Sequence, residues 1–133
     1  MRRFLTALAI WLAAAMPAAA QQTEIETVIA DQFERFRADD FAAAFEHASP
    51  TIRGLFGTPE NFGAMVRNGY PMVHRPKSFR FLDLGEGRRG LRQIVEVEDI
   101  AGRRHLLAYE MIETENGWKI NGVQLLPPPD VAA

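Results

Sequence analysis

The hydrophobic periodicity of this chain changes once, near residue 76, and that change limits the folds open to it. Up to residue 69, apolar residues recur every three or four positions, the period of an amphipathic helix. From Ser78 onward they alternate with polar residues, the period of a strand with one buried face. The alternation predicts strands at 78–84, 91–99, 105–114 and 118–125. Because only 85–90, 100–102 and 116–117 connect them, the strands are expected to form an antiparallel meander.

Capping signals divide the first half into helices. Thr23 and Glu26 form a capping box at the start of the first predicted helix. Asp39 or Asp40 is expected to cap a second helix. The apolar face of the first helix is predicted to carry Ile25, Val28, Ile29, Phe33 and Phe36.

Two proline-containing pairs mark further helix starts. Ser49-Pro50 predicts a short turn at 51–56, and Thr58-Pro59 predicts a helix at 59–68. Tyr70 and Arg75 each precede a proline, which favours extended backbone at both.

Turn residues and apolar faces also predict the strand register. A two-residue loop at Asn116-Gly117 would pair Glu115 with Trp118 and Glu113 with Ile120. A three-residue loop ending at Gly102 would pair Glu98 with Arg104, because a shorter loop would place a glutamate on the apolar face. Gly122 lies where the apolar parity of the last strand flips, which predicts a bulge. One inner face is then expected to carry Leu107, Tyr109, Met111, Trp118 and Ile120.

The first twenty residues have the pattern of a cleavable secretion signal. Arg2 and Arg3 precede the uncharged run 4–16, and Pro17 leads to the A-x-A site Ala18–Ala20. Thirteen helical residues span roughly 20 Å, too short for a bilayer core of about 30 Å, so no stable membrane insertion is expected after cleavage. We therefore predict a signal peptide at 1–20, a single domain at 21–126, a disordered proline-rich tail at 127–133, and a periplasmic or secreted protein.

Composition excludes several functional classes. The chain has 133 residues, 47% of them hydrophobic, which suits one globular domain. It has no cysteine, which excludes disulfides, thiol nucleophiles and cysteine-based zinc sites. Loss of Arg2 and Arg3 leaves 13 basic and 17 acidic residues, a net charge of −4 that argues against a nucleic-acid partner. No metal or cofactor motif is present, so neither is expected.

Four residues are candidate ligand-binding groups. Tyr70 and His74 belong to the segment YPMVHRP, where the chain crosses from helix to sheet, and such crossings often line a pocket mouth. Tyr109 and Trp118 are predicted on the inner sheet face, with Gln93 opposite Tyr109. Both regions also have a plain structural interpretation. In the crossing segment, Tyr70 covers the core and Arg75 pairs with an acid. On the sheet, the buried polar groups of Tyr109 and Gln93 bond to each other or to a helix end.

The remaining polar residues give weaker signals. Asp83 shares the parity of Phe79 and Phe81, so it is the one carboxylate expected to face inward as a base. His47 is interpreted as a cation at a helix end, and His105 as a strand residue opposite Val97. Two basic pairs, Arg88-Arg89 and Arg103-Arg104, are expected at opposite ends of the sheet. Glu113 and Glu115 are expected to neutralise the first pair.

Three runs carry a resemblance to a known family: ADDFAAAFEHASP (38–50), FGTPENFGAMVRNGYPMVHRP (56–76) and NGWKINGVQLL (116–126). They resemble an exported family described only as domain of unknown function 4864. That family is in turn similar to the nuclear transport factor 2-like, or cystatin-like, superfamily. The resemblance implies an α+β fold whose N-terminal helices pack in the hollow of a curved four-stranded antiparallel meander, a cystatin-like cone. Many members of the superfamily bind a small apolar molecule in the mouth of the cone, and some are isomerases or dehydratases.

Three hypotheses follow for the function. The first is a domain that binds a small apolar molecule or an envelope protein at the open end of the cone, through Tyr70, His74, Tyr109 and Trp118. The second is a cofactor-free proton-transfer enzyme that uses Asp83 with Tyr109 or His74. The third is an interaction module with an occluded cone, including a homodimer formed through the outer sheet face.

Overall fold

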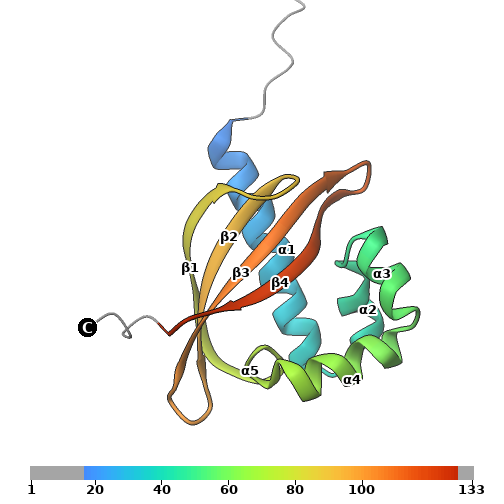
Figure 1. Ribbon diagram of the computed structural model, residues 1–133, viewed down its shortest axis with the longest axis vertical. Helices are drawn as coiled ribbons and strands as arrows, with labels where there is room; N and C mark the ends of the chain where they lie inside the picture. Colours follow the sequence, from blue (N-terminus) through green and yellow to red (C-terminus); the bar gives the residue numbers. More distant parts are fainter. Residues whose placement is uncertain (1–16, 129–133) are drawn as a thin grey trace, which may run out of the picture.

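The chain folds as helices followed by one antiparallel sheet. The computed structural model describes residues 17–128 (Figure 1). The elements are α1 (Ala18–Arg37), α2 (Phe41–Glu46), α3 (Pro50–Phe56), α4 (Pro59–Gly69), α5 (Pro71–His74), β1 (Pro76–Glu86), β2 (Leu91–Asp99), β3 (Arg104–Thr114) and β4 (Gly117–Leu126). The strands pair in the order β1-β2-β3-β4, so the predicted α+β class and antiparallel meander are confirmed.

Three of the predicted helix starts are confirmed by their capping bonds. The side chains of Asp40, Ser49 and Thr58 each accept a hydrogen bond from the backbone N–H three residues ahead, at 3.1–3.2 Å. The predicted cap at Thr23 is wrong. Its hydroxyl donates to the Ala19 carbonyl within α1, because the alanine- and glutamine-rich segment before it extends the helix back to Ala18.

The segment between α4 and the sheet forms a tight corner. Tyr70 and Arg75 have non-helical backbones, with φ near −136° at each, but their ψ values of 54° and 68° differ from the extended backbone that was predicted before proline. The four residues between them form the one-turn helix α5, which the sequence did not predict.

The register agrees with the prediction in one hairpin and differs in the other. Glu98 pairs with Arg104, as predicted from a loop ending at Gly102. In the last hairpin Glu113 pairs with Trp118, two residues from the predicted pairing. The predicted loop is 116–117, whereas Thr114 pairs with Gly117 and leaves 115–116 as the loop. Gly117 therefore takes its positive φ of 98° at the first residue after the loop. A shift of two residues keeps every side chain on its predicted face.

The strand pairing is interrupted by three register shifts, one of which lies between Pro76 and Ser78 at the start of β1. In β4, Asn121 has no partner on β3, so the bulge predicted beside Gly122 is confirmed. In β1 the register shifts between Phe81 and Leu84, and this bulge was not predicted. Leu84 packs against the core after the shift.

The core lies between one face of the sheet and α1. Phe33 of α1 stacks on Phe79 of β1 with ring centroids 4.4 Å apart, and the five predicted inner-face residues of β3 and β4 are buried. Helices α2, α3 and α4 lie beside the β4 edge (Figure 1). The opposite face carries cross-strand ion pairs, such as Arg80–Glu96 at 2.7 Å. Helix α1 therefore covers the core face of the sheet, and α2, α3 and α4 lie at the β4 edge.

The two ends of the chain extend past the described residues. Residues 1–16 of the predicted signal peptide and residues 129–133 of the predicted tail lie outside them. Strand β4 ends at Leu126, directly before Pro127, where the domain was predicted to end. Within residues 17–128, none of the helices is both long enough and apolar enough to cross a bilayer.

Candidate functional site

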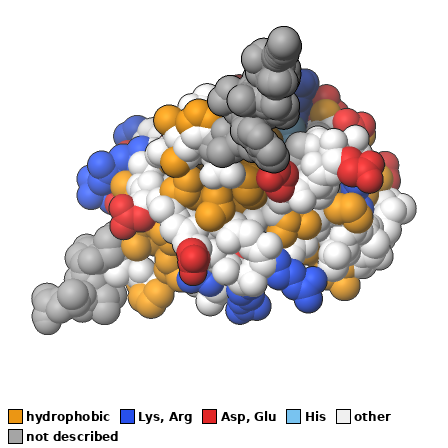
Figure 2. Space-filling view, turned by 90° about the horizontal axis from the view of Figure 1, so that it is seen from above, with side chains coloured by type: hydrophobic (Ala, Val, Ile, Leu, Met, Phe, Trp, Pro, Cys, Tyr) orange, Lys and Arg blue, Asp and Glu red, His pale blue; other side chains and the backbone are white. Residues whose placement is uncertain are grey.

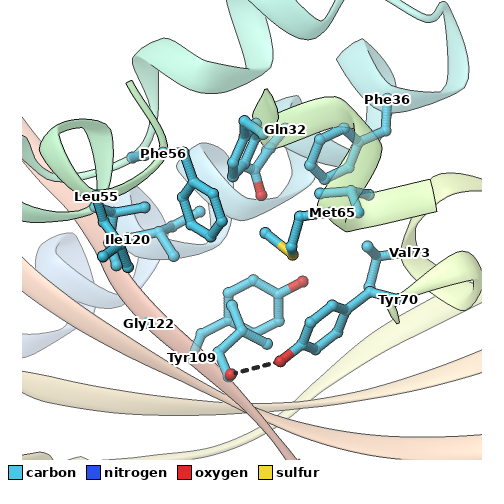
Figure 3. A pocket seen from close by; sticks show the side chains of 15 residues that line it. Gln32, Phe36, Leu55, Phe56, Met65, Tyr70, Val73, Tyr109, Ile120 and Gly122 are labelled. Atoms are coloured by element: carbon cyan, nitrogen blue, oxygen red, sulfur yellow. Dashed lines mark hydrogen bonds between the residues drawn. The ribbon is translucent and has the colours of Figure 1, made fainter. Parts of the chain in front are cut away.

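A pocket of about 330 Å³ lies between the inner face of β3–β4 and helices α1, α3 and α4 (Figure 3). None of its lining side chains is charged. The lining residues are Gln32, Phe36, Ala48, Ile52, Leu55, Phe56, Phe62, Met65, Val66, Tyr70, Val73, Tyr109, Ile120, Gly122 and Val123.

The outer wall of the pocket is α3, a short helix with no fully buried residue. Its N-cap holds it against the edge strand. The Ser49 backbone N–H donates to the Ile120 carbonyl at 2.8 Å, and the Ser49 hydroxyl donates to Asn121 Oδ1 at 2.7 Å. Ile52 and Leu55 line the space, while Leu55 also remains 72% exposed. The pocket is therefore open at the α3 side.

Three polar side chains line the otherwise apolar pocket. The Tyr70 hydroxyl donates to the Val123 carbonyl at 3.2 Å, and Gln32 Nε2 donates to the Ala44 carbonyl at 3.0 Å. Figure 3 shows the Tyr109 hydroxyl and the Gln32 amide oxygen directed into the space between the lining side chains.

The Tyr109 hydroxyl is the polar group best placed to meet a ligand. Among residues 17–128 it has no hydrogen-bond partner, although the residue is 1% exposed. Burial, with a smaller effect from nearby Tyr70, raises the pKa of Tyr109. The phenol therefore stays protonated and can donate a hydrogen bond to an acceptor within the pocket.

Two of the four predicted ligand-binding residues line the pocket and two do not. Tyr70 and Tyr109 are lining residues, whereas His74 and Trp118 are absent from the lining. His74 Nε2 instead bonds to Asp39 Oδ1 at 2.8 Å, and Arg75 forms an ion pair with the same aspartate at 3.1 Å. The predicted pairing of Arg75 with an acid is therefore confirmed, and His74 lies against the α1–α2 connection through the same aspartate.

Trp118 is a core residue, 6% exposed. Its indole nitrogen has no hydrogen-bond partner within the described part of the chain. It lies near the start of β4, whereas the β4 residues that line the pocket begin at Ile120.

Sequence reasoning missed Gln32 and Met65 as lining residues. Gln32 lies on the apolar face of the first helix, three positions after Ile29. A polar residue that interrupts an apolar face could have indicated a residue that lines a pocket. Met65 belongs to the predicted helix at 59–68 and was not assigned to a site. Figure 3 shows its sulfur in the middle of the pocket.

Gln93 has a structural role. It pairs with Tyr109 across the strands, as predicted, and is fully buried. Its amide does not bond to Tyr109. It donates to the carbonyls of Leu82 at 3.0 Å and Ile94 at 2.9 Å, with a longer bond to Asp83 at 3.4 Å. The structural interpretation in which Gln93 and Tyr109 bond to each other or to a helix end is therefore wrong for Gln93, whose partners are strand carbonyls.

The prediction that Asp83 faces inward is wrong. The β1 bulge places Leu84 on the inner face instead, and Asp83 is exposed. Among residues 17–128, no hydrogen bond joins its side chain to Tyr109 or His74. An exposed carboxylate away from both partners cannot act as the base of a buried proton-transfer site, so that mechanism loses its catalytic residue.

The other two histidines also bond to aspartates. His47 Nε2 lies 2.7 Å from Asp31, and His105 Nε2 lies 2.8 Å from Asp99. His105 pairs with Val97, as predicted. Within the described residues, no three potential metal ligands lie together.

The two basic pairs lie at opposite ends of the meander, as predicted. Arg88 and Arg89 belong to the β1–β2 turn, and Arg103 and Arg104 lie at the β2–β3 turn. Figure 2 shows basic side chains in separate groups on the face that it presents. The expected neutralisation of the first pair is wrong. Among residues 17–128 neither Arg88 nor Arg89 forms an ion pair with Glu113 or Glu115.

Comparison with known proteins gives a family. A family model described as a domain of unknown function, DUF4864, matches residues 18–133. The chain belongs to this family. No curated protein matches the chain, and no solved structure does.

The DUF4864 match begins at the first residue of α1 and includes the whole sheet, so both walls of the pocket belong to the family domain. The predicted resemblance to family 4864 is confirmed. Because the DUF4864 description assigns no activity, the function has to be argued from the pocket itself.

Proposed function

We propose that this protein binds a small, mostly apolar molecule in the pocket between the sheet and α3–α4. The observation that carries the proposal is a space of about 330 Å³, within the range of about 300–1,000 Å³ for ligand pockets, with an unpartnered phenol directed into it. A structural core of this size would be expected to fill such a space with side chains.

The lining limits the chemistry of the ligand. No charged side chain faces the pocket, so the part of the ligand that lies inside is uncharged. The Tyr109 hydroxyl donates to an oxygen on the ligand. The volume of about 330 Å³ lies at the small end of the range for ligand pockets, which suits a compact molecule.

The family resemblance agrees with this proposal. We infer that the bent sheet and the helices form a cone of the nuclear transport factor 2-like kind, with the pocket at its open end. Members of that superfamily often bind apolar molecules at this place. A protein partner that covers the exposed Leu55 is the competing occupant, and the experiment below distinguishes it.

Binding of straight-chain primary alcohols tests the proposal. Affinity should rise about fourfold for each added methylene, from about 0.8 kcal/mol per buried group, until the pocket is full. In an isotope-labelled sample, the backbone resonances of Met65 and Tyr109 should shift on titration.

A blocking variant provides the control. Met65→Trp places a larger ring in the middle of the pocket and should abolish alcohol binding. Ile100→Trp adds the same ring to an exposed turn and should bind as the wild type does. If no alcohol from butanol to octanol shifts these resonances, the proposal is wrong and a protein partner becomes the better explanation.

We also propose that the protein is exported, and that it meets its ligand in the periplasm or outside the cell. Cleavage after Ala20 would remove only the first turn of α1, and Ala18 and Ala19 there are exposed. The buried face of the helix begins later, at Ile25, so the core would survive. Thr23 and Glu26 would then lie near the new helix start, where a capping box acts.

N-terminal sequencing of the protein from a cell-envelope fraction should begin at Gln21. Recovery of an uncleaved chain from the cytosol would contradict the proposal.

A further inference from the structure

A polar groove of about 490 Å³ adjoins the apolar pocket. Arg88 and Arg89 of the β1–β2 turn line it, together with Thr51 of α3 and Asn121 of the β4 bulge. Gly122 and Val123 line both the groove and the pocket. The two spaces therefore border the bulged segment of β4 from different sides, the pocket from the inner face of the sheet and the groove from the side of Glu110.

The helix α3 follows the same boundary. Thr51 lines the polar groove, and the next residue, Ile52, lines the apolar pocket. Gly122 contributes no side chain to the boundary, and a Cβ built on it would meet no atom within 4 Å. The boundary between α3 and β4 therefore separates the two spaces, and no side chain of Gly122 stands in it.

The groove has an excess of positive charge. Within the described residues, Arg88 and Arg89 form no ion pair, although most other arginines on the sheet do. The one carboxylate that lines the groove, Glu110, accepts from Arg92 Nε at 2.7 Å and from the Arg88 backbone N–H at 3.1 Å. The charge of Arg88 lies near enough to Glu110 to help lower the pKa of that carboxyl, but within the described residues neither Arg88 nor Arg89 uses its guanidinium group in an ion pair.

From this arrangement we infer that the ligand is a small amphiphilic carboxylate. Its apolar chain occupies the pocket, and its carboxylate binds Arg88 and Arg89 across the α3–β4 boundary. The inference rests on the proposed function and adds the chemical class of the ligand. Guanidinium groups suit a carboxylate because their paired N–H donors match its two oxygens. The Thr51 hydroxyl adds a further donor at the same place.

Hexanoate and hexanol form the matched pair of probes, since they share the chain and differ in the charged end. At pH 7 and low salt the wild type should bind hexanoate at least tenfold more tightly than hexanol, and added salt should reduce the difference. The double variant R88Q/R89Q should lose about tenfold in hexanoate affinity and keep its hexanol affinity. The other basic pair supplies the control, because R103Q/R104Q lies at the far end of the sheet and should bind both probes as the wild type does.

The outcomes separate this inference from the proposed function. If hexanol binds and the R88Q/R89Q variant binds hexanoate as tightly as the wild type, the carboxylate inference is wrong and the apolar pocket stands. The same conclusion follows if R103Q/R104Q causes the same loss, since the effect would then come from net charge alone. If neither probe binds the wild type, the proposed function fails as well. Circular dichroism of both variants should match the wild type, because all four arginines are exposed.

Discussion

The amide of Gln93 is expected to hold the β1 bulge, and its replacement should cost measurable stability. The side chain is fully buried, and its Nε2 donates to two close carbonyls, those of Leu82 at 3.0 Å and Ile94 at 2.9 Å. Gln93→Met keeps the length of the side chain and removes the donor. Both carbonyls then lose this side-chain donor.

Two opposing effects set the size of the loss. An unsatisfied buried acceptor costs about 1–3 kcal/mol, so two of them cost about 2–6 kcal/mol. The wild type already carries one such group, because Gln93 Oε1 has no partner among residues 17–128, and methionine removes it. The expected net loss is therefore about 1–3 kcal/mol, a large share of the total of about 5–15 kcal/mol for a domain.

Urea unfolding followed by circular dichroism measures this difference, and the slope m should stay constant. Gln124→Met is the matched control, because Gln124 is exposed on β4 and its loss should change the free energy of unfolding by less than about 0.5 kcal/mol. If Gln93→Met is as stable as the wild type, then the bulge does not depend on the amide and the reasoning is refuted.

Three further predictions concern single residues. Gly90→Ala should destabilise the protein by about 1–3 kcal/mol in urea, because its Cβ would collide with a backbone carbonyl of β3. Gly85→Ala, with open space around it, should not. The hydrogen bond from His105 lowers the pKa of Asp99 to about 2 from an ordinary 3.8. The stabilisation that the ionised Asp99 carboxylate gives to the fold is therefore complete above about pH 4 and is lost as the pH falls toward 2. Urea midpoints of Asp99→Asn should therefore fall less over that range than those of the wild type, and parallel curves would contradict this. Tyr109→Phe should leave the melting temperature unchanged or raised but weaken alcohol binding severalfold, and unchanged binding would show that the phenol does not contact the ligand.

The sequence predicted the sheet well because side-chain alternation and turn residues act locally. In the β2–β3 hairpin, a loop of the wrong length would have moved a glutamate to the apolar face, so pattern and turn agreed on one register. In the β3–β4 hairpin the predicted and observed registers differ by two residues. Met111 and Trp118 face inward in both, so burial could not discriminate between them. Only the turn geometry decided, and Gly117 takes its positive φ after the turn instead of within it.

The candidate site was harder to predict because it depends on contacts between distant residues. Asp83 continues the local alternation of Phe79 and Phe81, and nothing near it in the sequence marks a bulge. The bulge is held by Gln93, ten residues later on the neighbouring strand. In the same way, the partner of His74 is Asp39, 35 residues earlier, in a connection whose only local feature is its charge.

The β4 bulge links the pocket, the helix α3 and the basic turn, and it explains why Gly122 lies at their meeting point. The extra residue, Asn121, leaves the strand pairing and accepts a hydrogen bond from Ser49, which ties the start of α3 to the sheet edge. Later along α3, Ile52, Leu55 and Phe56 line the pocket instead of filling it. The same bend returns Val123 to the inner face, where its carbonyl accepts from Tyr70. A parity flip at one glycine, visible in the sequence, thus marks the segment of β4 that borders both the pocket and the groove of Arg88 and Arg89, although the sequence does not reveal that these arginines lie beside it.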